Sequence, residues 1–305
     1  MTGLKNVGWL SLLLFAILGS CDNNEVFEEE EQTQRVISGE TGSFIFDSYA
    51  PLANKPLRVF YHYPEQVNNS TPILMVFHGG SRNARTSRDA LIAKANQKGL
   101  IIIAPEFSAA DFSLGDEYIL GNVFVDGDNP SAATLNAESE WTFSYVEPLF
   151  DEVKNRTANQ NSAYYAFGFS AGAQFLHRFL LFKPNARVSK AVSAAAGWYT
   201  MPDFQVDFPY GVGEAPISQS DLNSFYARDQ WVIVGQNDND PNAPRRNATV
   251  DVQGTNRLDR ARYFVDESRN LAAATSSAFN WQYRSIPNTG HEFDELANYA
   301  VDNVF

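Results

Sequence analysis

The feature that most constrains this chain is a serine set between glycines at the end of an apolar run. Residues 164–169 read Tyr-Tyr-Ala-Phe-Gly-Phe, and the chain continues as Ser170-Ala171-Gly172 before a second apolar segment with helical spacing. A chain that turns directly from a strand into a helix crowds its own backbone, and glycines two residues before and after the serine remove the Cβ atoms that would clash. The pattern predicts a serine on a sharp turn between a buried strand and a helix.

Strand-like and helix-like segments alternate along most of the chain. Short runs typical of strands lie at 43–46, 57–63, 73–77, 100–104, 163–169, 188–195, 231–235 and 279–286. Helical spacing is found at 89–97, 138–154, 171–182, 257–274 and 292–304. The stretch that follows the expected strand at 100–104 and ends near residue 136 is rich in Asp, Gly, Asn and Ser, which predicts a long loop.

This alternation predicts an α/β fold in which helices cover both faces of a mostly parallel central sheet. We expect one folded domain over residues 41–305, with a small irregular cap segment at about 197–229. In sheets of this kind, ligands bind at the carboxyl ends of the strands. Ser170 lies at such an end, so the functional site is expected around it.

The N-terminus has the features of an export signal. Lys5 precedes an apolar run at 7–18 that is too short to span a bilayer, and small residues then lead to Cys21. Because Cys21 is the only cysteine in the chain, we expect residues 1–20 to be a lipoprotein signal peptide whose removal leaves Cys21 to be lipidated. The alternative is an ordinary secretory signal followed by an unpaired cysteine. Neither leaves a disulfide in the mature chain.

Charge narrows the range of partners. The net charge is −13, and six acidic residues fall between positions 22 and 31. Such a run cannot bury apolar surface, so residues 21–40 are expected to form a flexible acidic tether. Lysine and arginine form no dense patch along the sequence, so nucleic acid is not an expected partner. We expect a bacterial cell-envelope protein, periplasmic or at the cell surface, that is held to the membrane by its N-terminal lipid.

A serine hydroxyl is a weak nucleophile unless a base lies within reach. Among the four histidines, His291 follows the last expected strand and precedes the last expected helix, which brings it to the same sheet edge as Ser170. His291 is therefore the expected base. His62 lies within an early strand, and His177 lies two turns into the helix that follows the serine. His78 immediately precedes a glycine pair and is expected to anchor that loop.

A third side chain is needed to orient the imidazole and to stabilise its cation. Asp238 sits in the tight turn that follows Gly235 at the end of the strand expected at 231–235, so we choose it for this position. Asp240, two residues further on, is the alternative, because strand boundaries read from a sequence are uncertain by several residues.

Catalysis by a serine also requires donors for the oxyanion of the intermediate. The backbone N–H of Ala171, at the start of its helix, is one candidate. A second is expected in the loop after residues 73–77, where two glycines allow the backbone to approach a ligand closely. We choose Gly80, with its neighbours Gly79 and Ser81 as alternatives.

Two aspartate-rich turns could be mistaken for metal sites. Residues 238–249 begin like a calcium-binding loop, but Ala243 stands where the turn glycine is needed and Thr249 stands where a bidentate glutamate is needed. Residues 126–128, Asp-Gly-Asp, are expected to form a simple turn. We therefore expect neither a metal nor a cofactor.

Taken together, these motifs resemble the α/β-hydrolase superfamily over residues 57–305. The motifs are His78-Gly79-Gly80, Gly168-Phe169-Ser170-Ala171-Gly172, Gly235-Gln236-Asn237-Asp238 and Gly290-His291. The chain order of serine, aspartate and histidine agrees with that family. Within it, the chain is similar to the secreted serine esterases grouped with polyhydroxybutyrate depolymerases and feruloyl esterases. The resemblance implies a carboxylic ester hydrolase that works through an acyl-enzyme, although many members of that group carry cysteines that this chain lacks.

Clues to the substrate are fewer. Trp198 and Tyr199 begin an aromatic stretch that is expected to form either a small satellite core or the wall of a pocket for an apolar or aromatic acid. Arg245 and Arg246 are expected either to pair with Asp251 or to bind a substrate carboxylate.

We therefore predict a lipid-anchored serine esterase that acts on a small or polymeric ester. Two other functions are open at this stage. One is a peptidase on the same fold, which would need a protonated leaving group and an extended subsite. The other is a surface lipoprotein that binds a ligand without catalysis. Turnover of matched esters and amides separates the three.

Overall fold

The central strands consist of apolar residues because both of their faces are covered. All five residues of β3 (Ile73–Phe77) are fully buried, and β4 (Ile101–Glu106) is buried over its first five residues. The other strands are β1 (Thr41–Phe46), β2 (Leu57–His62), β5 (Tyr164–Phe169), β6 (Val188–Ala194), β7 (Gln230–Gly235) and β8 (Gln282–Ile286). The computed structural model describes residues 38–242 and 245–305.

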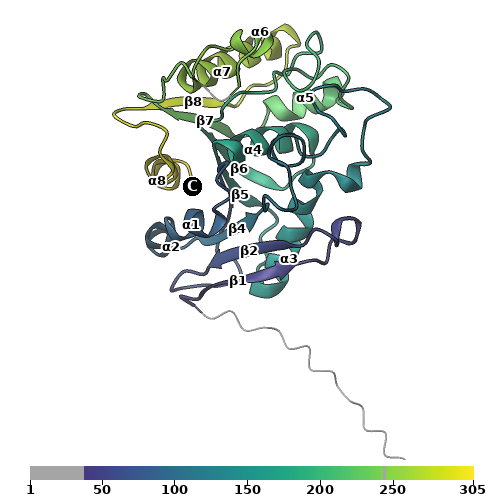
Figure 1. Ribbon diagram of the computed structural model, residues 1–305. Helices are drawn as coiled ribbons and strands as arrows, with labels where there is room; N and C mark the ends of the chain where they lie inside the picture. The colour runs from purple at the N-terminus through teal and green to yellow at the C-terminus, as the bar shows by residue number, and fades with distance from the viewer. Residues whose placement is uncertain (1–37, 243–244) are drawn as a thin grey trace, which may run out of the picture. The chain divides into compact units, whose positions relative to one another are not determined.

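The strands of this described part form one eight-stranded sheet in the order β1-β2-β4-β3-β5-β6-β7-β8. β2 pairs antiparallel with β1 and with β4, whereas the pairings from β4 through β3 to β8 are all parallel. In Figure 1 the sheet runs through the middle of the molecule, with β8 at one edge and β1 at the other. The expected α/β-hydrolase-like architecture with a mostly parallel sheet is confirmed.

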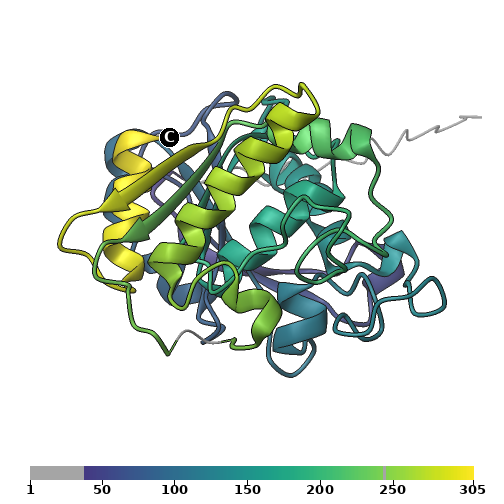
Figure 2. The same cartoon turned by 90° about the horizontal axis from the view of Figure 1, so that it is seen from above.

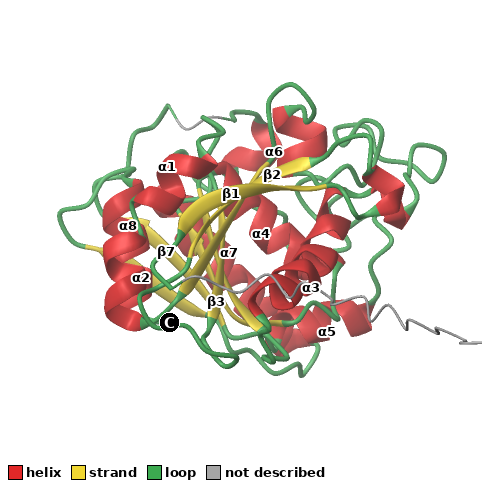
Figure 3. Cartoon of the chain, turned by 90° about the horizontal axis from the view of Figure 1, so that it is seen from below, coloured by secondary structure: helices red, strands yellow, loops and turns green. Residues whose placement is uncertain are grey.

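Helices cover both faces of this sheet (Figure 1; Figure 3). One face carries α1 (Ala84–Asp89), α2 (Ile92–Lys98) and α8 (Phe293–Asn303). The other carries α3 (Val146–Thr157), α4 (Ala171–Phe182), α5 (Gln219–Tyr226) and α7 (Arg257–Ala274), with the single turn α6 (Ala248–Asp251) before α7. Figure 2 shows α7 running alongside β7 and β8, with α8 on the opposite side of these strands. All twelve residues of α4 are buried, so this helix has the most protected position of those described.

The helix expected at 138–154 begins later than the sequence suggested. Glu138–Glu140 and Thr142–Tyr145 form short 3₁₀ turns, and α3 starts only at Val146. Pro148 explains the difference, because proline is tolerated in the first turn of a helix but breaks a helix interior.

Two further helical turns lie in segments that were expected to be irregular. Leu114–Ile119 forms a π-helix within the expected long loop, and α5 lies within the expected cap segment at 197–229. α5 begins with a capping box in which Ser218 and Asp221 each accept a hydrogen bond from the backbone N–H of the other residue. That spacing is visible in the sequence and could have revealed the helix.

The N-terminal predictions fall mostly outside the part that the structure describes. The expected signal peptide at 1–20, the lipidated Cys21 and the expected tether up to residue 37 lie there. Among the helices of residues 38–242 and 245–305, none is both long enough and apolar enough to cross a membrane.

Candidate active site

Ser170 occupies the turn between β5 and α4 with a left-handed backbone, φ 55° and ψ −110°. A Cβ atom on Gly168 would lie 2.3 Å from the Gly172 carbonyl oxygen, and a Cβ atom on Gly172 would lie 2.1 Å from the Phe77 carbonyl oxygen. Both distances are far inside van der Waals contact, so both positions require glycine. The turn that presents Ser170 exists because these two side chains are missing.

His291 connects Ser170 to Asp238. Its Nε2 lies 3.1 Å from Ser170 Oγ, and its Nδ1 lies 2.7 Å from Asp238 Oδ2. Because an ionised carboxylate only accepts hydrogen bonds, Nδ1 carries the proton and Nε2 can accept one from the hydroxyl. The structure thus brings together three side chains that are far apart in the sequence.

The loops that carry Asp238 and His291 touch through their backbones. A Cβ atom on Gly235 would lie 2.3 Å from the Thr289 carbonyl oxygen, so only glycine permits this approach. The Asn237 N–H donates to the same carbonyl at 2.8 Å. Since β7 and β8 are parallel neighbours, both loops leave the sheet at the edge where β5 delivers Ser170.

Asp238, rather than Asp240, faces the histidine. Its side chain is 3% exposed, and Oδ1 accepts a hydrogen bond from Arg257 Nη1 at 3.2 Å. The guanidinium compensates the buried carboxylate, which would otherwise be costly to desolvate. Asp240 is exposed and accepts hydrogen bonds from Asn242 instead. Nothing in the sequence distinguished Arg257 from the other arginines, so this contact was missed.

The two backbone N–H groups expected to bind an oxyanion, those of Ala171 and Gly80, have no hydrogen-bond partner among the described residues. Ala171 is the first residue of α4, so its N–H has no partner within the helix. Considering residues 38–242 and 245–305 together, neither this N–H nor that of Gly80 donates a hydrogen bond. Donors that are already in place and unpaired are what a tetrahedral intermediate requires.

His78 and the backbone of Arg82 together hold the peptide group between Gly79 and Gly80. The Arg82 N–H donates to the Gly79 carbonyl oxygen at 3.1 Å. The imidazole is fully buried, and its Nε2 accepts a hydrogen bond from the Phe107 N–H at 3.1 Å. Its Nδ1 therefore donates to the Gly79 carbonyl oxygen at 2.9 Å. Because the peptide group is planar and trans, the Gly80 N–H points away from that oxygen. Burial lowers the pKa of His78 to about 4, so the ring stays neutral in this position.

The other two histidines are buried without contact to Ser170. His62 forms hydrogen bonds with two polar side chains, Thr41 and Asn96. His177 has the same pattern as His78: its Nε2 accepts from a backbone N–H at 3.1 Å and its Nδ1 donates to a carbonyl oxygen at 2.9 Å. His291 is thus the one histidine of the chain that contacts the serine.

A cavity of about 260 Å³ opens beside the Ser170 hydroxyl. Its walls come from the loop after β3, from α1, from the end of β5 and from the start of α8. The lining residues are Gly79, Gly80, Ser81, Asn83, Thr86, Ser87, Phe169, Ser170, His291, Phe293 and Asp294. The Phe169 ring packs against the imidazole of His291 with the centroids 4.7 Å apart, which supports that imidazole from one side. The cavity is the place where a substrate would reach the serine.

The sequence interpretation did not include Phe293 and Asp294 in the site. They follow His291 by two and three residues, so the spacing alone could have suggested them. The residues contributed by α1, such as Thr86 and Ser87, carry no such signal, because nothing in the sequence links α1 to Ser170.

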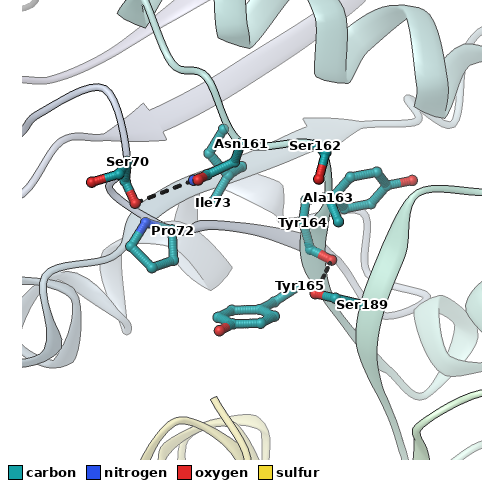
Figure 4. A pocket seen from close by; sticks show the side chains of 9 residues that line it. All are labelled: Ser70, Pro72, Ile73, Asn161, Ser162, Ala163, Tyr164, Tyr165 and Ser189. Atoms are coloured by element: carbon teal, nitrogen blue, oxygen red, sulfur yellow. Dashed lines mark hydrogen bonds between the residues drawn. The ribbon is translucent and has the colours of Figure 1, made fainter.

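A second pocket lies at the amino ends of the strands, whereas Ser170 lies at their carboxyl ends. Figure 4 shows it at the amino ends of β3 and β5, between Pro72, Asn161 and Ser189. Its volume is about 210 Å³. Asn161 donates there to the Ser70 carbonyl oxygen at 3.3 Å, and the described lining includes no histidine. This pocket therefore lacks the base that a nucleophilic serine needs.

Trp198 and Tyr199 do not line the described walls of the cavity beside Ser170. Trp198 is 3% exposed, and the Arg178 guanidinium lies 4.1 Å from its ring centroid. Tyr199 is fully buried and stacks on Phe264 with the centroids 4.2 Å apart, and burial raises its pKa well above the usual range. The structure packs both residues into the core, which is the arrangement of the satellite-core alternative rather than of a pocket wall.

The two arginines after Asp238 have separate partners. Arg246 forms an ion pair with Asp251 at 2.8 Å, which was one of the two expectations, and hydrogen bonds to this arginine lower the pKa of Asp251. Arg245 pairs with Asp128 and donates to the Tyr210 hydroxyl at 2.6 Å. Neither guanidinium lines the cavity beside the serine, as far as the chain is described.

The aspartate-rich segment at 126–128 forms the expected turn. Asp126 accepts a hydrogen bond from the Asp128 N–H at 3.0 Å, which closes the expected turn at 126–128. Over the described ranges, no three His, Cys, Asp or Glu side chains gather in a way that could hold a metal ion.

Comparison with known proteins gives the family. No family model and no curated protein matches the chain. Among solved structures, one hydrolase shares this fold and 35% of its sequence, and the chain covers 99% of it. The chain therefore belongs to the α/β-hydrolase family of serine hydrolases. That hydrolase is poly(aspartic acid) hydrolase-1 from Sphingomonas sp. KT-1, which matches 88% of this chain with a TM-score of 0.82.

Two further solved structures are similar to this chain. LpqC, a poly(3-hydroxybutyrate) depolymerase from Bordetella parapertussis, is 27% identical with a TM-score of 0.81, over 88% of this chain and 89% of that chain. An S-formylglutathione hydrolase from Agrobacterium tumefaciens is 13% identical with a TM-score of 0.54, over 88% of this chain and 94% of that chain, and shows the fold alone. The resemblance inferred from the motifs is confirmed.

Proposed function

We propose that the chain is a serine esterase that cleaves carboxylic esters through Ser170, His291 and Asp238. The observation that carries the proposal is the continuous chain of contacts from Ser170 Oγ to His291 Nε2 at 3.1 Å and from His291 Nδ1 to Asp238 Oδ2 at 2.7 Å. Nucleophile, base and orienting carboxylate are the three parts that acyl transfer by a serine requires.

In the proposed mechanism, neutral His291 takes the proton of the Ser170 hydroxyl as Oγ attacks the ester carbonyl. The carbonyl oxygen becomes an oxyanion and is held by the N–H groups of Ala171 and Gly80. Asp238 stabilises the imidazolium, which then gives its proton to the leaving alcohol. Water, deprotonated by the same imidazole, attacks the acyl-enzyme; collapse of the second intermediate releases the carboxylic acid and restores the serine.

The test is hydrolysis of p-nitrophenyl acetate by the wild type and by Ser170→Ala. We expect the variant to lose at least about 10³-fold in kcat, since removal of a triad member leaves only oxyanion binding. Ser162→Ala is the matched control, because it removes an exposed serine at the amino end of β5, the end opposite to Ser170. It should behave as the wild type. If folded wild-type protein is inert toward short acyl esters near neutral pH, the proposal fails in favour of a ligand-binding protein.

Amide hydrolysis at the same site is the second candidate, because the 35%-identical relative is named for a polymer of amino acid residues. The same catalytic groups serve both bonds, but an amine leaves only when it is protonated. Comparing kcat/KM for a matched p-nitrophenyl ester and p-nitroanilide decides between them. An anilide cleaved as fast as the ester would favour the amidase.

The substrate on the esterase proposal is a small or a polymeric ester, by analogy with the depolymerase LpqC.

We also propose that the enzyme is a lipoprotein of a bacterial cell envelope, attached through Cys21. The support is the sequence: a basic residue, an apolar run at 7–18 and a solitary cysteine after small residues. Expression with an alkynyl fatty acid should label the wild type but not Cys21→Ser, and the variant should leave the membrane fraction. Equal labelling of both proteins would contradict the anchor without touching the esterase proposal.

A further inference from the structure

The cavity beside Ser170 carries one fixed charge. Of its lining residues, only His291 and Asp294 have ionisable side chains, and His291 must be neutral to act as a base. Asp294 lies in the first turn of α8 and is exposed to solvent. Within the described chain its carboxylate makes no ion pair and no hydrogen bond. A free carboxylate therefore faces whatever enters the cavity.

No lysine or arginine of the described residues lines this cavity to offset the charge. Arg85, beside the lining residue Thr86 on α1, is directed to Asp89 at 3.7 Å. A substrate with an acidic substituent would thus meet Asp294 without a counter-ion and be repelled. A cationic substituent would meet complementary charge.

Two phenyl rings add to this preference. Phe169 and Phe293 both line the cavity, and their rings pack edge to face with the centroids 5.6 Å apart. Aromatic faces attract cations within about 6 Å of the ring centroid, and ammonium groups are commonly recognised in this way. Carboxylate and aromatic rings in one small cavity suit an ammonium group better than a neutral or acidic one.

The position of the charge relative to the base identifies the side of the ester. His291 Nε2 must protonate the leaving oxygen, so the alcohol of the substrate has to lie against His291. Phe293 and Asp294 lie two and three residues after His291 and line the same cavity, so we infer that the substituent of the alcohol extends toward them. The volume of about 260 Å³ is just below that of pockets for drug-sized ligands, about 300–1,000 Å³. The group bound there is small.

We propose that the preferred substrates are carboxylic esters whose alcohol carries a small ammonium group, and that Asp294 is the residue that selects them. This inference rests on the proposed esterase function, since it concerns the same serine and the same cavity. Asp294 acts on binding of the substrate and takes no part in proton transfer.

The test compares kcat/KM for two acetate esters of nearly equal shape, those of choline and of 3,3-dimethylbutanol, which differ by one positive charge. The acetate ester of 3-hydroxypropanoate supplies a negative charge. For the wild type we expect the choline ester to be favoured about tenfold over the neutral one, and the anionic ester to be the poorest. The preference should decline between 0.05 and 0.5 M salt, because salt screens exposed charges. Asp294→Asn should bring the choline-to-neutral ratio close to one.

Glu295→Gln is the matched control, because it removes the same charge from the next residue of α8, which is exposed and does not line the cavity. It should keep the wild-type ratio. Equal turnover of the choline and neutral esters by the wild type would overturn the inference and leave the esterase function standing. Loss of the preference in Glu295→Gln as well would assign it to the general charge of the helix end, against a selecting Asp294. Inertness toward all three esters would instead refute the esterase proposal itself.

Discussion

The position of Ser170 depends on the absence of two Cβ atoms, those that Gly168 and Gly172 lack. Its left-handed backbone is held because β5, α4 and the end of β3 approach one another at Gly168 and Gly172, where a Cβ atom would collide with backbone oxygens. On the other side of the hydroxyl, the His291 imidazole is held by the buried Asp238 carboxylate, which Arg257 compensates. Each of these contacts can be removed by one substitution.

Gly172→Ala should destabilise the protein by about 2–4 kcal/mol, because the new methyl group would lie 2.1 Å from the Phe77 carbonyl oxygen and the backbone must move. Urea unfolding measures the loss. Gly115→Ala, where a Cβ atom meets nothing within 4 Å, is the control and should change stability little. Equal stabilities of the two variants would mean that the turn is not as tight as described.

Asp238→Asn should lower kcat by about 10⁴ with little change in KM, because an amide can donate to Nδ1 and hold the imidazole in the wrong tautomer. Asp240→Asn removes the neighbouring exposed carboxylate and should leave kcat unchanged. Steady-state kinetics with p-nitrophenyl acetate separates the two. A larger effect at Asp240 would reverse the choice between these residues.

At this scale the sequence predicted the positions that depend on local turns. Ser170, Asp238 and His291 each follow a recognisable strand, so their meeting at one sheet edge could be inferred. Arg257 and Asp294 could not, because their importance arises from contacts made across the fold and not from any local pattern.

The element that shapes the proposed oxyanion site is the loop after β3. Two hydrogen bonds hold the Gly79 carbonyl oxygen, one from the buried His78 imidazole and one from the Arg82 N–H, so the Gly80 N–H points away from that oxygen. The same imidazole accepts a hydrogen bond from the Phe107 N–H. His177 makes an equivalent pair of backbone hydrogen bonds at the far side of α4 and has no contact with the serine. Substitution of His177 can therefore serve as the control for substitution of His78.

His78→Phe should lower kcat about 10-fold beyond its effect on stability, because the Gly79 carbonyl oxygen loses one of its two hydrogen bonds and keeps only that from the Arg82 N–H, and a misplaced oxyanion donor is costly. His177→Phe also leaves a backbone N–H unpaired and should destabilise by a similar 1–3 kcal/mol, with kcat per folded molecule unchanged. Rates normalised to the folded fraction show the difference. If both variants keep wild-type kcat, His78 has only a structural task.

Elements were predictable where burial alone determined them. β3 and β4 are continuous apolar runs because both faces are covered, and such runs stand out in a sequence. The start of α3 was missed because Pro148 outweighs the amphipathic pattern around it, and α5 was missed because its capping residues lie in a segment of irregular composition.

The whole molecule keeps two imidazoles uncharged in its interior. Burial lowers the pKa of His78 to about 4 and lowers that of His177 well below the ordinary value of 6.5. As the pH falls below 6.5, these two histidines bind protons in the unfolded chain but stay neutral in the folded chain, so acid favours unfolding. The two imidazoles cost no stability above pH 6.5, where they are neutral in both states, and the cost grows as the pH falls toward 4.

We therefore expect the free energy of unfolding to decrease by about 3 kcal/mol from His78 alone between pH 7.5 and 4, at about 1.4 kcal/mol per unit of pKa shift. Urea titrations at several pH values measure the slope. A double variant His78→Phe, His177→Phe retains the carboxylates and should show a clearly shallower slope over this range. Parallel slopes for the two proteins would mean that neither imidazole is held neutral.

The central claim is that the Ser170 hydroxyl is made nucleophilic by His291 and Asp238. A fluorophosphonate probe tests it directly, because it reacts covalently with an activated serine. Mass spectrometry of the labelled wild type should locate the adduct on Ser170, and Ser170→Ala should not be labelled. An adduct on another residue, or labelling that persists in Ser170→Ala, would contradict the account.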